Sequence, residues 1–181
     1  TQSLSSAASD VYKRQFTILA DKNAETDVAA MQRQFDFITD VNTTVDKAHT
    51  SIEKIRAINK QLKAFKKQYK SNEAIKELIE KADTLSKQFS DIEKALYQTK
   101  NKSGQDPLNF PIRLTNKLAH LNSLVSMDDF PPTTQDIAVK NELTKAITKE
   151  LDTLEALISG EIKTFNQEFN KKQLNYLFIE Q

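Results

Sequence analysis

Apolar side chains recur every three or four positions along most of this chain, with polar residues between them. This spacing matches the period of a helix with one buried face and does not match the strict alternation of a strand. We therefore predict an all-α protein, an elongated antiparallel up-down bundle of four helices that pack along heptad-like seams. The predicted helical domain spans residues 24–181.

The first predicted helix begins at Thr26 as its N-cap and covers about 42 residues, or roughly 60 Å. Its expected buried seam steps through Val28, Met31, Phe35, Ile38, Val45 and Ile52, with Asn42 and His49 at two further seam positions. After Ile52 the seam shifts by three residues and continues through Ile55, Ile58, Leu62 and Phe65. Such a slip predicts local overwinding of the helix pair.

The second predicted helix has the most regular pattern in the chain. Its apolar residues alternate steps of three and four and are Ile75, Leu78, Ala82, Leu85, Phe89, Ile92 and Leu96. A polar loop over 97–109 follows, with Gly104 and Pro107. A third, shorter helix is expected to start near Pro111 and to bury Leu114, Leu118, Leu121 and Val125.

The fourth predicted helix follows two prolines and takes Thr133 or Thr134 as its N-cap. Its seam is Ile137, Ile147, Leu151, Leu154, Ile158, Ile162, Phe165 and Phe169. Two successive four-residue steps coincide with Gly160 in this seam, and together they predict a bend. Because the first and fourth helices are the longest, we also expect their ends to project as a two-helix stalk.

The first 23 residues do not share the helical pattern. Residues 1–15 (TQSLSSAASDVYKRQ) are rich in serine and resemble a translated sequencing-adapter scar, while an ordinary disordered terminus is the alternative. Residues 16–19 have a β-type composition and are expected to be the last strand of a preceding domain, with 20–23 as the linker.

The composition narrows the classes of partner. The formal net charge is +1, so no overall field favours nucleic acid or an anionic membrane. The sequence has no cysteine, which excludes disulfide and thiolate chemistry. No apolar run approaches the roughly 20 residues needed to span a bilayer. We therefore expect neither a nucleic-acid partner nor a membrane span.

Few residues have the types and spacing that catalysis or metal binding needs. His49 and Glu53 could supply two metal ligands, but the favoured interpretation is that His49 is a polar seam residue that fixes the helix register. His120 is expected to be structural. The neighbouring carboxylates of Asp128 and Asp129 could bind Ca²⁺ or transfer protons, although solvation of a helix end explains them better. We predict no catalytic residue, no cofactor and no metal site.

Two features suggest interaction surfaces. A basic cluster at the end of the first helix contains Lys60, Lys63, Lys66, Lys67 and Lys70. Favourable interaction with the helix dipole explains this cluster, and binding of an anionic glycan or peptide is the alternative. The apolar tail, with Leu174, Tyr176, Leu177, Phe178 and Ile179, is expected to pack on the bundle or on a neighbouring domain.

Two stretches carry a resemblance to a known family. The stretch FTILADKNAETDVAAMQRQFDFITDVNTTVDKAHTSIEKIRAINKQL resembles the junction that follows the final β-domain of large bacterial BNR-repeat, sortilin-like propeller proteins, often labelled glycosyl hydrolases. The stretches LNFPIRLTNKLAHLNSLV and PPTTQDIAVKNELTKAITKELDTLEALI resemble the C-terminal helices of the same proteins. The resemblance covers roughly residues 16–181 and involves no catalytic motif.

This resemblance implies a larger exported protein, periplasmic or at the cell surface, in which β-propeller and β-sandwich domains precede the helices. The strand at 16–19 would then be the last of the sandwich. Any glycosidase activity would belong to the propeller. The expected function is a non-catalytic C-terminal module that supports the upstream domains or forms a homodimer. The alternatives are an anion-binding module and an inert fragment of a carbohydrate-active polypeptide.

Overall fold

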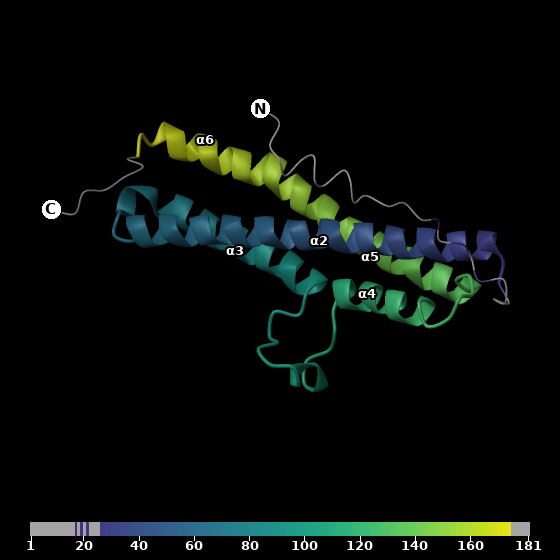
Figure 1. The fold of residues 1–181 in the computed structure, drawn as a ribbon. Coiled ribbons are helices and arrows are strands. Elements are labelled where there is room, and N and C mark those ends of the chain that lie inside the picture. Colours follow the sequence, from purple (N-terminus) through teal and green to yellow (C-terminus); the bar gives the residue numbers. More distant parts are fainter. Residues whose placement is uncertain (1–16, 18, 20, 22–25, 175–181) are drawn as a thin grey trace, which may run out of the picture.

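The longest helix, α2 (Val28–Tyr69), runs the length of the molecule, and the other helices pack along it (Figure 1). The computed structural model describes residues 17, 19, 21 and 26–174. The other helices in chain order are η1 (Glu73–Ile75), α3 (Lys76–Leu96), η2 (Asp106–Leu108), α4 (Leu114–Val125), α5 (Thr134–Ala156), η3 (Leu157–Ile162) and α6 (Lys163–Lys171). The predicted all-α fold, an elongated antiparallel helical bundle, is confirmed.

Helices α3 and α4 lie end to end along α2, and both run antiparallel to it (Figure 1). Arg56 pairs with Glu93 at 2.7 Å and Lys66 pairs with Asp83, so α3 covers the second half of α2. Asn122 bonds to Asn42, and the side-chain amide of Gln34 donates to the carbonyl of Val125, so α4 covers the first half.

The chain therefore does not reverse direction between α3 and α4, as a strict up-down-up-down order requires. The linker over 97–113 is long enough to carry the chain outward and back onto the same side of α2 (Figure 1). The predicted two-helix stalk is wrong, because α4 covers the part of α2 that α3 leaves open. Helices α5, η3 and α6 then run parallel to α2, from Lys140 beside Asp40 to Phe165 beside Phe65.

A row of buried residues at intervals of seven runs along the core face of α2: Val41, Ala48, Ile55, Leu62 and Tyr69, with Ala30, Phe37 and Ile52 buried beside it. The seven-residue spacing is the same before and after Ile52. The predicted three-residue slip of the seam at that point is therefore wrong. That prediction began from Val28 and Phe35, which are 68% and 63% exposed. Asn42 and His49 of the predicted seam are also exposed, whereas Ile52 is buried and Ile38 and Val45 pack against the core.

The core faces of α3 and α4 match the sequence pattern. All seven predicted seam residues of the second helix are buried, from Ile75 in η1 to Leu96 in α3, and Phe89 is fully enclosed. On α4, Leu118, Leu121 and Val125 are buried and Leu114 is half-buried. Helix α4 begins at Leu114 and not at Pro111. The carbonyl of Pro111 accepts a hydrogen bond from the side-chain amide of the buried Gln98 at 2.8 Å, which holds the residues before α4 outside the helix.

The helix starts are fixed by side-chain caps. Asp27, and not Thr26, caps α2 by accepting the backbone N–H of Ala30 at 2.6 Å. Thr133 caps α5 in a reciprocal capping box with Asp136, as one of the two predicted candidates. In α5 and α6 the buried seam residues are Ile147, Leu154 and Phe165, whereas the predicted seam residue Ile137 is 44% exposed.

The predicted irregularity at Gly160 takes the form of a π-helix, η3, between α5 and α6. A π-turn absorbs one extra residue, which accommodates the two successive four-residue steps of the seam. Nothing lies within 4 Å of a Cβ added at Gly160, so packing does not require glycine there.

Replacing Gly160 with alanine is therefore expected to stabilise the protein by about 1 kcal/mol, because glycine is the poorer helix former. Urea unfolding followed by circular dichroism measures the change. Destabilisation by this substitution would show that the wide turn depends on the flexibility of glycine.

Candidate functional site

The lysine-rich end of α2 divides between two faces of the helix. Lys66 is partly covered and pairs with Asp83 of α3. The other four lysines, Lys60, Lys63, Lys67 and Lys70, are exposed and follow steps of three, four and three, which places them on one outward face. We call these four residues the lysine stripe. The sequence predicted the cluster, and the structure separates Lys66 from it as a contact within the bundle.

The tail is only partly within the described residues. Leu174 is half-buried and packs against the core. Tyr176, Leu177, Phe178 and Ile179 lie outside the described residues, as do residues 1–16 of the predicted N-terminal segments. Residues 17, 19 and 21 of the predicted strand and linker belong to no helix or strand, and Leu19 is 81% exposed.

Exposed apolar residues that the sequence patterns did not reveal lie at the end of the bundle where α2 begins. We call this set the apical patch, and it consists of Val28, Phe35, Leu124, Met127, Phe130 and Ile137. Three of them, Val28, Phe35 and Ile137, belong to the predicted buried seams. Val28 and Phe35 lie off the seven-residue row of α2, and Ile137 lies before the first buried turn of α5.

Several contacts hold the elements of the apical patch together. Gln34, one residue before Phe35, donates its side-chain amide to the carbonyls of Val125 and Asp128. Ile137 lines a shallow surface together with Phe37 and Pro132. The start of α2, the α4–α5 connection and the start of α5 therefore meet at this end of the bundle (Figure 1).

The residues considered for metal or acid–base chemistry do not converge. His49 and His120 are exposed, and His49 makes an edge contact with the ring of Tyr97 at 6.2 Å instead of fixing the helix register. Asp128 and Asp129 are exposed in the α4–α5 connection. Within the described residues, no group of three histidine, aspartate or glutamate side chains is placed to hold a metal ion.

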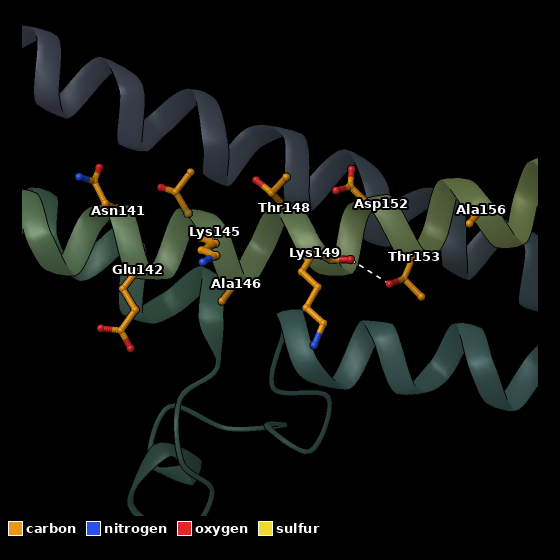
Figure 2. Close-up of a pocket in the computed structure, with 10 residues that line it drawn as sticks. Asn141, Glu142, Lys145, Ala146, Thr148, Lys149, Asp152, Thr153 and Ala156 are labelled. Atoms are coloured by element: carbon orange, nitrogen blue, oxygen red, sulfur yellow. Dashed lines mark hydrogen bonds between the residues drawn. The ribbon is translucent and has the colours of Figure 1, made fainter.

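One open surface depression is formed by α5 alone (Figure 2). Its side chains include both signs of charge, at Glu142, Lys145, Lys149 and Asp152. Figure 2 shows Glu142 and Lys149 extending from the side of the helix opposite to Asp152. Because these groups diverge, they provide no common point at which a substrate would meet an acid and a base.

A more enclosed groove lies between α2 and the helices η3 and α6. We call it the distal groove. Its lining comprises Ile58, Gln61, Leu62, Phe65, Ile162, Phe165, Asn166 and Phe169, six apolar side chains and two amides. The ring of Phe65 stands edge-on to Phe165 at 5.3 Å and to Phe169 at 5.9 Å. The absence of charge among these lining residues suits an apolar occupant.

Asp106 lies in the α3–α4 linker, where hydrogen bonds perturb its carboxylate. Backbone N–H groups of Lys102 and Ser103, followed by the Ser103 hydroxyl, hydrogen-bond to its carboxylate and lower its pKa. A lowered pKa means that the contribution of this group to stability is present above the unfolded-state pKa and is lost as the pH falls through the folded-state pKa. Asp106 thus shapes the α3–α4 linker and has no catalytic partner there.

The described helices include none whose length and apolar character would let it cross a membrane. Comparison of the whole chain with family models, with curated proteins and with solved structures finds no match.

Proposed function

We propose that this chain is a non-catalytic helical interaction module, the C-terminal part of a larger exported polypeptide of the BNR-repeat propeller type. In this proposal the module supports the domains that precede it. The apical patch docks on the adjoining β-sandwich, and the chain itself carries out no hydrolysis. Homodimerisation is not part of this role.

The observation that carries the proposal is the position of the apical patch. Six apolar side chains are between 44% and 75% exposed at the end of the bundle where the chain enters α2. Several exposed apolar residues at one end of a bundle are typical of a region that contacts another domain or protein. A domain attached before residue 16 would lie within reach of this end, and the resemblance of residues 16–62 to a domain junction supports the same arrangement.

Hydrogen exchange in the longer polypeptide tests this proposal. The reading frame is extended upstream in the genomic source, and the full product is compared with the isolated chain. We expect amides of residues 124–139 to exchange several-fold more slowly in the full product, because the docked domain covers them. Residues 55–69, at the other end of α2, serve as the internal control and should exchange equally in both proteins.

Equal exchange at residues 124–139 would overturn the docking role, as would a reading frame that starts directly before this chain. Size-exclusion chromatography with light scattering adds an independent outcome. A dimer of the isolated chain that dissociates on replacing Met127 with glutamate would assign the apical patch to self-association instead.

A second candidate function is binding of an anionic glycan or peptide through the lysine stripe. The supporting observation is that four lysines share one exposed face of α2 while Lys66 points to Asp83. Ammonium groups arranged in this way attract an extended polyanion, and salt weakens the attraction by screening.

Changing all four stripe lysines to glutamine is expected to abolish retention on a sulfated-polysaccharide column at low salt. The matched control changes four scattered exposed lysines, Lys76, Lys87, Lys145 and Lys149, and has the same net charge. If both quadruple variants lose retention equally, net charge and not the stripe explains the binding. If the unmodified chain is not retained, this candidate function is rejected.

A further inference from the structure

We propose that the distal groove is the intramolecular docking site for the apolar C-terminal tail, residues 175–179 of this same chain. The proposal concerns the end of the bundle opposite to the apical patch and does not depend on the proposed function. It joins two features, an uncharged groove lined by aromatic residues and an apolar segment that comes directly after α6.

The chain changes direction at the end of α6. Gln173 has a φ of 49°, in the left-handed region that commonly ends helices and reverses the chain. The backbone N–H of Gln173 donates to the carbonyl of Asn170 at 3.1 Å, and Lys172 donates to Glu168 and Phe169. A left-handed position is unfavourable for a residue with a Cβ, so its presence here indicates that packing of the adjoining residues stabilises the reversal.

Leu174 provides the first contact after the reversal. This side chain is half-buried against the core, directly beyond α6. The next residues read NYLFI, five positions with four apolar side chains, and no charge before Glu180. A segment of this composition gains stability by leaving water, at about 25 cal/mol per Å² of apolar area buried.

The tail is long enough to cover the groove. The lining residues of η3 and α6 extend back from Phe169 to Ile162, which is about 10 Å along a helix. Five extended residues beyond Leu174 reach roughly 17 Å. The tail can therefore lie over Phe169 and Phe165 and end near Ile162. Gln61 and Asn166, the two amides of the lining, are available to bond to its backbone.

Tryptophan fluorescence offers a direct test, because the chain contains no tryptophan. In the Tyr176→Trp variant the single indole reports on the tail. We expect a blue-shifted emission maximum and a several-fold lower acrylamide quenching constant than in the same variant in denaturant. Adding Ile58→Glu, which places a carboxylate in the groove, should shift the emission back to that of an exposed indole.

Two further measurements keep the result unambiguous. Adding Phe178→Glu alters the tail without touching the groove, and it should also expose the indole while the helical circular dichroism is unchanged. The protection of the indole should be independent of protein concentration. An exposed indole in the parent variant would overturn the proposal, and so would protection that disappears on dilution, since it would assign the groove to a second copy.

Discussion

Replacing Phe89 with alanine is expected to lower the free energy of unfolding by about 3–5 kcal/mol. Phe89 is fully enclosed, at 0% exposure, in the middle of the most regular seam of the bundle. Removal of its ring leaves a cavity that the surrounding helices close only in part. Urea unfolding monitored by circular dichroism measures the loss.

The matched control is Phe35→Ala, which removes the same ring from an exposed position. Phe35 is 63% exposed, so we expect a change within about 0.5 kcal/mol. A large loss of unfolding free energy in Phe35→Ala would mean that Phe35 is buried, as the sequence pattern predicted. It would contradict the observed orientation of the first part of α2.

Replacing Leu118 with alanine is expected to cost about 2–5 kcal/mol, and the effect should be confined at first to one half of the molecule. Leu118 is fully buried on α4, which covers the first half of α2. Hydrogen exchange should therefore accelerate more at residues 30–48 than at residues 55–69.

The control for this prediction is Leu124→Ala on the same helix, where the side chain is 48% exposed and the expected loss is small. Acceleration that is equal in both halves of α2 after Leu118→Ala would contradict the end-to-end arrangement of α3 and α4. It would favour a layout in which α4 packs beside α3.

The sequence predicted the helices well because the buried residues of α3, α4 and the second half of α2 are large and regularly spaced. The first half of α2 is different, since apolar residues lie on both its buried and its exposed faces: Phe37 and Val41 are buried, whereas Val28 and Phe35 are exposed. Spacing alone does not choose between these faces, so the predicted seam began from Val28 and Phe35 and introduced a slip that the helix does not have.

The directions of α3 and α4 could not be read from periodicity. A seam shows which face of a helix is buried, but it does not show whether the next helix reverses or continues along the same partner. Hydrogen bonds of buried polar residues between the end of α3 and the start of α4 determine this direction. The hydroxyl of Thr115 donates to the carbonyl of Leu96 at 2.9 Å, and Gln98 donates to Pro111, so the two helix ends are tied at one level of α2.

The candidate interaction surfaces were predictable in part. Exposed lysines at the end of α2 follow from their spacing, and the apolar tail follows from composition. The apical patch did not follow, because apolar residues on helices were assigned to the core. The distal groove also needs the structure, since it is formed by residues about 100 positions apart in the sequence, such as Phe65 and Phe165.

A distance between spin labels on α3 and α4 tests the central structural claim most directly. The chain has no cysteine, so Gln88→Cys and Ser123→Cys, both at exposed positions, label only these two sites. Asn59 of α2 bonds to Ser90 of α3, and Asn42 of α2 bonds to Asn122 of α4, so the two labelled positions lie beside distant parts of α2. The rise of a helix along this length of α2 predicts that the labels are separated by about 30 Å or more. A separation close to the 8–10 Å between packed helix axes would place α4 beside α3 and contradict the account.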